Sequence, residues 1–192
     1  MRSSKSTGLN ESLRLLLQLL RQQDRCPPAS ASAAINRATS QMLILAAIYD
    51  LSVAEEDDGR VQLGRWCETF VRAVERGLGG AMDVEFSSGV EARIPAQVAQ
   101  TLGLALGELL ADVHDRMINA GLQPKAQLAL DQDCDGRLMA IVRDVLPPGD
   151  LPALATELAL AVGGRLSQLD TEAYCERRLT FDLDARLSLE CL

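Results

Sequence analysis

The spacing of apolar residues predicts two helices in the first quarter of the chain. Leu9, Leu13, Leu16, Leu17 and Leu20 fall on one face of a helix, which ends at Cys26-Pro27-Pro28 because proline cannot continue a helix. A second helix begins near Ser30 or Ser32. Its apolar positions alternate by three and four residues, as in a coiled-coil seam: Ile35, Ala38, Met42, Leu45 and Tyr49. One such hairpin cannot bury this much apolar surface, so we expect two copies to pair as a four-helix bundle.

The pattern changes after the acidic stretch 54–59, which reads as a solvated helix end and turn. We therefore divide the chain into a helical dimerisation domain, 1–56, and a second domain, 57–192. Periodicity and turn residues in the second domain predict helices over 63–78, 95–113 and 152–162 and strands near 82–86, 92–94, 126–130, 138–142, 166–169 and 179–183. The 92–94 strand is expected to pair with 82–86. The fold class is α+β, with helices on one face of an antiparallel or mixed sheet.

The composition excludes some classes of function but does not identify the function. Of the 192 residues, 3% are aromatic, the formal net charge is −8 and there is a single His. The negative charge counts against a nucleic-acid partner, because such a partner must be bound through its phosphates. The single His counts against a multi-His metal site.

The cysteines and the apolar runs bear on location. The five cysteines are scattered and form no CxxC, which predicts neither zinc nor a disulfide framework: Cys26, Cys67, Cys134, Cys175 and Cys191. Reduced thiols are typical of the cytoplasm. The N-terminus lacks a signal-peptide pattern, and the Leu-rich stretch 13–20 is too short to span a bilayer. We expect a cytoplasmic protein with no membrane partner.

Five segments together resemble a known family. The segment 13–21 resembles the helix that follows the phosphoacceptor His of bacterial sensor histidine kinases, and 37–51, with Tyr49-Asp50-Leu51, resembles their second helix. The segment 102–110 resembles the start of the N box, 142–144 the strand before the first glycine box, and 158–166 the closing helix-Gly-Gly-strand element. The order is similar to that of the HWE type. The resemblance implies dimerisation helices followed by a GHKL (Bergerat-type) ATPase domain.

The chain departs from the family at the phosphoacceptor. The resemblance places Thr7 where the phosphoacceptor His belongs. An imidazole forms a phosphoramidate that can be passed to an aspartate, whereas a threonine ester does not readily hand on its phosphoryl group. We therefore expect no autophosphorylation on His at that position and no catalytic residue there.

The implied nucleotide pocket also departs from the family. The resemblance aligns Asp112 with the Asn that holds Mg²⁺, retains Glu108, and aligns Asp144 with the Asp that reads the adenine amine. Both glycines that should follow Asp144 are replaced within Val145-Leu146-Pro147-Pro148, and the residues 149–151 leave little room for a lid. Without a run of backbone N–H groups to cradle phosphate, we expect a vestigial pocket that takes neither ATP nor Mg²⁺, and no other metal.

Three other patterns have a structural interpretation. The residues 131–136 resemble the start of an EF-hand loop, but position twelve is Val142 and the flanks read as strands, so a hairpin turn is favoured. His114, beside Asp112 and Asp115, lacks a nucleophile partner and reads as an ordinary helix residue. Trp66 and Phe70 are expected in the core.

The leading hypothesis is a degenerate histidine-kinase-like homodimer that binds the receiver domain of a response regulator. The helices that pair and carry the binding face are marked by Leu13, Arg14, Leu17, Gln18, Met42, Leu45 and Tyr49. The alternative is an enzyme, a phosphotransferase or atypical kinase that uses Thr7, His114 or a nonstandard pocket with Asp112 and Asp144. A fragment of a longer protein is the third possibility.

Overall fold

The computed structural model describes residues 39, 42, 46, 59–78 and 80–182. Its main feature is a five-stranded sheet in the order β2-β4-β5-β7-β6. The strands are β2 Asp83–Ser88, β4 Lys125–Gln132, β5 Leu138–Asp144, β6 Arg165–Asp170 and β7 Cys175–Phe181. The β2–β4 pair is parallel and the other three pairs are antiparallel. The expected mixed sheet is confirmed.

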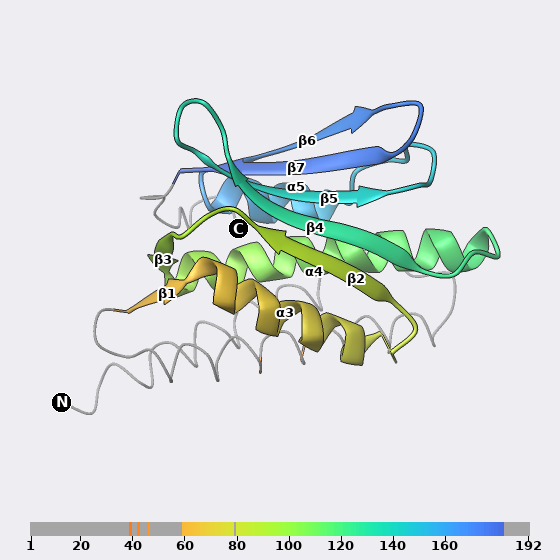
Figure 1. Ribbon diagram of the computed structural model, residues 1–192, viewed down its shortest axis with the longest axis horizontal. Coiled ribbons are helices and arrows are strands. Elements are labelled where there is room, and N and C mark those ends of the chain that lie inside the picture. The colour runs from red at the N-terminus through yellow and green to blue at the C-terminus, as the bar shows by residue number, and fades with distance from the viewer. Residues whose placement is uncertain (1–38, 40–41, 43–45, 47–58, 79, 183–192) are drawn as a thin grey trace.

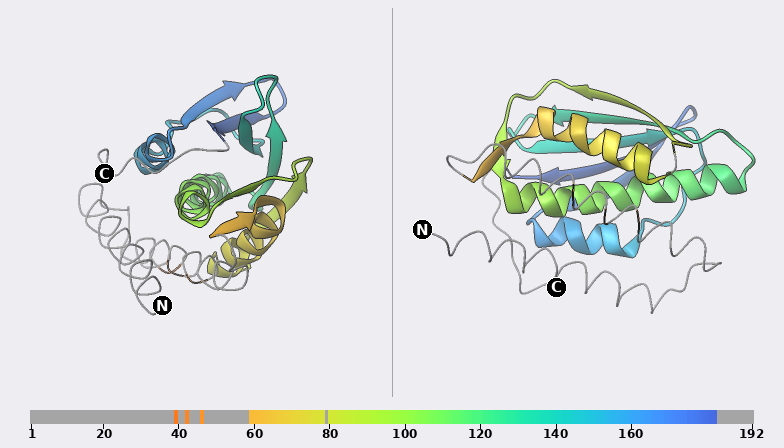
Figure 2. Two further views of the ribbon diagram at one scale, coloured as in Figure 1. Left: turned by 90° about the vertical axis from the view of Figure 1, so that its left-hand side faces the viewer. Right: turned by 90° about the horizontal axis from the view of Figure 1, so that it is seen from below.

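Three helices lie on one face of this sheet (Figures 1 and 2). They are α3 Leu63–Gly77, α4 Ala96–Asn119 and α5 Ala153–Ala161. The three helices and the inward side chains of the sheet share one apolar core, in which Trp66 and Phe70 stack with ring centroids 5.4 Å apart. The described part of the chain is therefore an α+β sandwich of two layers, and the core positions of Trp66 and Phe70 are confirmed.

The helices form where the periodicity predicts them, but α4 continues to Asn119, six residues beyond its predicted end. The side chain of Gln62 caps α3 by accepting a hydrogen bond from the Arg65 N–H at 2.6 Å. Pro95 lies immediately before α4 rather than in its first turn. Every residue from Thr101 to Ala111 is buried, because this stretch of α4 is apolar around nearly its whole circumference. A helix of this kind forms the centre of the core.

The predicted pairing of the 92–94 strand is wrong. The strand β3 Arg93–Pro95 pairs antiparallel with β1 Arg60–Gln62 in a separate two-stranded sheet, with Val61 opposite Ile94. The Ser88 hydroxyl bonds both the N–H and the C=O of Val90, which turns the chain away from β2. The strand β1 was not predicted, because three residues are too few to show an alternating pattern.

The predicted start of the last strand is also wrong. The strand β7 begins at Cys175, four residues before the expected position, and ends at Phe181. The charged residues Glu176 and Arg177 read as loop in the sequence, but both are buried and ion-paired within the sheet. In β7, a charged residue in the sequence therefore does not indicate a solvent-exposed position.

The turns around the sheet follow the glycines and aspartates. The β4–β5 hairpin closes with Gly136 at φ +78°, and Asp133 Oδ1 accepts hydrogen bonds from the N–H groups of Asp135 and Arg137. The hairpin interpretation of 131–136 is therefore confirmed. At the start of β6, a Cβ on Gly164 would lie 2.7 Å from the Thr180 carbonyl oxygen, so only glycine fits this approach of β6 to β7.

Most of the predicted helical hairpin lies outside the described residues. Thr39, Met42 and Ala46 are helical, within the range expected for the second helix, and the side chain of Met42 is half-exposed. The four-helix bundle and the 56/57 domain boundary remain predictions. Among the described residues, no helix is long and apolar enough to cross a membrane.

Candidate functional site

The candidate site is built on a buried arginine, Arg177, that reaches three other elements. Its Nη1 lies 3.2 Å from Asp144 Oδ2 at the end of β5, and its Nη2 lies 3.3 Å from Asp112 Oδ2 on α4. Its Nε donates to Gln168 Oε1 on β6 at 3.4 Å. Neither Arg177 nor the Asp144 side chain has any exposed surface. The two carboxylates that the sequence assigned to a nucleotide pocket are thus brought together on one guanidinium.

Both oxygens of Asp144 are occupied. Its Oδ1 accepts a hydrogen bond from the Leu146 N–H at 2.8 Å, and its Oδ2 accepts one from Arg177. The contact of Arg177 with Asp112 is an ion pair by distance but not an aligned hydrogen bond. The cluster is therefore held most firmly on the β5 side.

A second arginine fastens the loop between β5 and α5. Arg116 lies one helical turn after Asp112, with Nη1 3.6 Å from Asp112 Oδ2, and its Nη2 donates to the Pro147 carbonyl oxygen. A Cβ placed on Gly149 would lie 3.2 Å from Arg116 Cζ. The loop therefore packs directly on the guanidinium, and there is no extended lid between Asp144 and α5.

The remaining candidates on α4 lie close by in sequence. Glu108 is buried one turn before Asp112, on the same helix face. The Nδ1 of His114 lies 3.2 Å from Asp115 Oδ1, and the His114 side chain is mostly buried. Within the part of the chain that is described, no three His, Cys, Asp or Glu side chains gather closely enough to hold a metal ion.

The positions assigned to phosphotransfer and pairing fall mainly in the N-terminal segment. Apart from Met42, they lie outside the described residues: Thr7, Leu13, Arg14, Leu17, Gln18, Leu45 and Tyr49. Their roles remain predictions.

Sequence reasoning missed Arg177, although a signal was present. Residues 175, 177, 179 and 181 alternate along β7, and Leu179 and Phe181 belong to the core. Arg177 therefore stands in the inward phase of the strand. A lone arginine at such a position requires a buried carboxylate partner.

A second ion-pair group lies on the other face of β7. Glu176 has 1% of its side chain exposed, pairs with Arg143 Nε at 2.6 Å, and also accepts a hydrogen bond from Arg178 Nε. Burial favours the neutral acid, but the hydrogen bonds from the two arginines outweigh it and lower the pKa of the Glu176 carboxyl.

Glu176→Gln is expected to reduce the free energy of unfolding by about 1.5–3 kcal/mol near neutral pH, because it removes the charge from two hydrogen bonds. A carboxyl whose pKa is lower in the folded chain stabilises the fold above its unfolded pKa, and the contribution is lost as the pH falls through the folded value. The difference in free energy of unfolding between the variant and the unsubstituted chain should therefore become smaller below about pH 4.5. Urea denaturation from pH 3 to 8 measures this. Glu85→Gln, on the same sheet face but exposed, is the matched control, and an equal loss there would contradict the role of burial.

The comparisons with known proteins agree on the fold. No protein family model matches the chain, and no curated protein matches it. A blue-light activated histidine kinase from Erythrobacter litoralis (EL346) superposes with a TM-score of 0.74 at 16% identity, covering 100% of this chain and 63% of that chain. The histidine kinase domain of the same protein gives a TM-score of 0.59 at 16% identity, covering 89% of this chain and 87% of that domain. This chain therefore shares its fold with these histidine kinases. The chain spans less than two thirds of the first of these two solved chains.

A histidine kinase fold raises the question of ATP and Mg²⁺, and the residues present do not fit them. The Asp144 side chain has no exposed surface, and its two oxygens already accept hydrogen bonds from Leu146 and Arg177, so an adenine amine could reach it only by displacing these groups. A Mg²⁺ ion on Asp112 Oδ2 would stand beside the guanidinium groups of Arg116 and Arg177. Two fixed cations at that oxygen oppose a third through charge repulsion.

Proposed function

We propose that this chain is a degenerate histidine kinase of the HWE type that works by binding rather than by catalysis. In this proposal it is a cytoplasmic homodimer that binds the receiver domain of a response regulator and does not use ATP. The observation that carries the proposal is Arg177, which lies fully buried between Asp112 and Asp144.

The ion-pair cluster supports the loss of nucleotide binding through charge. In a pocket for ATP and Mg²⁺, the two carboxylates would face a bound cation and an adenine amine. Here the side chain of Arg177 supplies the positive charge from within the fold. The Arg116 contact with Pro147 and the pair Pro147-Pro148 support the same conclusion, because they replace a glycine-rich phosphate loop with a short, fastened connection.

Binding to a receiver domain is supported by the fold and by the sequence of the first 56 residues. The described residues share their fold with a histidine kinase. The apolar seam through Met42, Leu45 and Tyr49 is typical of helices that pair, and Thr7 replaces the phosphoacceptor. A helical bundle that lacks the phosphoacceptor His can still bind a receiver domain. In this proposal the chain therefore either competes with an active kinase for that domain or acts as an adaptor.

The nucleotide part of the proposal is tested by thermal unfolding with ATP and Mg²⁺. A ligand present at 100 times its dissociation constant adds about 2.7 kcal/mol to stability, which corresponds to a Tm rise of about 5–10 °C for a chain of this length. We expect no rise at millimolar ATP, and no label on the chain from γ-labelled ATP. A rise of this size, or label lost on Thr7→Ala or His114→Ala, would overturn the proposal in favour of an enzyme.

The binding part is tested by titration with receiver domains from the same genome. We expect at least one to bind at concentrations where kinase cores bind, and Leu17→Asp to abolish that binding. Leu169→Asp makes the same chemical change at an exposed site on β6 and should have no effect. Failure of every receiver domain to bind would refute this part. Light scattering of the same samples checks the homodimer.

A further inference from the structure

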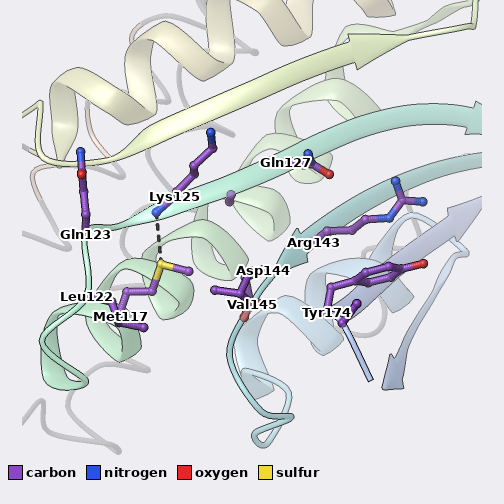
Figure 3. A pocket seen from close by; sticks show the side chains of 11 residues that line it. Met117, Leu122, Gln123, Lys125, Gln127, Arg143, Asp144, Val145 and Tyr174 are labelled. Atoms are coloured by element: carbon purple, nitrogen blue, oxygen red, sulfur yellow. Dashed lines mark hydrogen bonds between the residues drawn. The ribbon is translucent and has the colours of Figure 1, made fainter. Parts of the chain in front are cut away.

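A cleft opens at the end of the sheet where β4 begins and β5 ends (Figure 3). Its volume is about 620 Å³, within the range of pockets that bind small molecules. The end of α4, the first residues of β4, the end of β5 and the β6–β7 turn each supply part of its lining. The cleft shares only Asp144 with the Arg177 cluster, and that carboxylate is already fully paired there.

The apolar part of the lining is unusually exposed. Leu122, Val145 and Tyr174 all line the cleft, and each is among the large apolar side chains that the described surface leaves in contact with solvent. Val145 is 69% exposed. Apolar side chains gathered in a concave site, rather than scattered over the surface, mark a place where an apolar body can be buried.

The polar part of the lining is positively charged and rich in donors. Lys125 and Arg143 line the cleft together with the side-chain amides of Gln123 and Gln127, and Figure 3 shows these side chains around it. The Lys125 ammonium is held only by exposed carboxylates, Glu85 at 2.9 Å and Asp83 at 3.8 Å. Such solvent-exposed pairs are weak and can be exchanged for the carboxylate of a ligand.

Arg143 contributes to both the apolar and the positively charged part of the lining. Its guanidinium lies 5.5 Å from the centroid of the Tyr174 ring while its Nε remains bound to Glu176. An arginine placed over an aromatic ring presents both a stacking surface and N–H donors to whatever enters beside it. Of the charged side chains that line the cleft, Lys125 and Arg143 are cationic and the one carboxylate, Asp144, is paired with Arg177. An anionic ligand that displaces the exposed Glu85 and Asp83 from Lys125 therefore meets two cations in the lining, on a molecule whose net charge is −8.

We propose that this cleft binds a small aromatic carboxylate, with the ring against Val145, Leu122 and Tyr174 and the carboxylate facing Lys125 and Arg143. The site is separate from the cluster that carries the proposed function. It requires neither nucleotide nor receiver binding, so the two can fail independently.

The test is a titration of the ¹⁵N-labelled full chain with 1-naphthoate, followed by amide chemical shifts. Saturable shifts are expected at the amides of Lys125, Val145 and Tyr174. The neutral analogue 1-naphthalenemethanol should bind about tenfold more weakly, the ratio that corresponds to about 1.4 kcal/mol. This comparison separates charge recognition from simple burial of a ring.

Two variants decide the outcome without disturbing the core. Val145→Asp places a negative charge at a highly exposed position in the cleft and should weaken 1-naphthoate binding at least about tenfold. Lys125→Gln should bring naphthoate down to the affinity of the neutral alcohol. Leu169→Asp, exposed on β6 and outside the lining, should leave binding unchanged. The proposal is overturned by shifts that do not saturate or lie elsewhere, by equal affinity for acid and alcohol, or by full binding to Val145→Asp.

Discussion

Arg177→Ala is expected to lower the free energy of unfolding by about 3–5 kcal/mol, the cost of breaking a buried ion pair by removing one partner. The variant leaves Asp144 with no exposed surface and without its cation, and it removes the contacts with Asp112 on α4 and Gln168 on β6. Urea denaturation followed by circular dichroism at pH 7.5 measures the loss.

A double substitution separates charge from packing. In Asp144→Asn with Arg177→Met, both charges are gone, while Asn keeps an oxygen for the Leu146 N–H and Met fills much of the arginine's volume. Replacement of a buried ion pair by uncharged groups of similar size is often near neutral. The double variant should therefore recover at least half of the stability lost by Arg177→Ala. A loss below about 1 kcal/mol in Arg177→Ala itself would mean that the cluster is not a buried ion pair in solution.

The cluster explains how the fold accommodates the fully buried Asp144 and the partly buried Asp112 close to one another. A buried, unpaired carboxylate is costly, so under the proposed function the acids that would have faced ATP and Mg²⁺ must be neutralised or replaced. Asp112 and Asp144 are both present, and the neutralising charge comes from β7 instead. The proposal of a binding protein without kinase activity thus rests on an electrostatic requirement as well as on missing motifs.

Much of the fold of residues 59–78 and 80–182 follows from the sequence because its patterns are long. The helix α4 contains many turns of apolar residues, β2 and β4 alternate between inward and outward positions, and β5 is a run of mostly buried residues. Glycines after α5 and the Asp-Gly pair of the β4–β5 hairpin mark the turns. Periodicity and turn chemistry therefore act together over most of the domain.

The sequence did not predict the elements whose conformation depends on pairing with another strand rather than on a pattern within the element. The strands β1 and β3 are three residues each, and only their contact with one another defines them. The start of β7 is charged, and it lies between β5 and β6, with Arg143 opposite Glu176 and Asp144 paired to Arg177. At the site, the sequence identified Asp112 and Asp144 through a resemblance, but the cation between them requires knowledge of which strands are neighbours.

Leu109→Ala is expected to cost about 2–5 kcal/mol of folding free energy, because it removes a side chain with no exposed surface and leaves a cavity. Leu109 lies in the stretch of α4 that is buried around its circumference. Ile118, on the same helix, is 52% exposed, so Ile118→Ala should change stability by no more than about 0.5 kcal/mol. Both variants replace one aliphatic side chain by alanine on one helix, so the difference reports burial alone. Equal losses in urea denaturation would mean that α4 does not occupy the centre of the core.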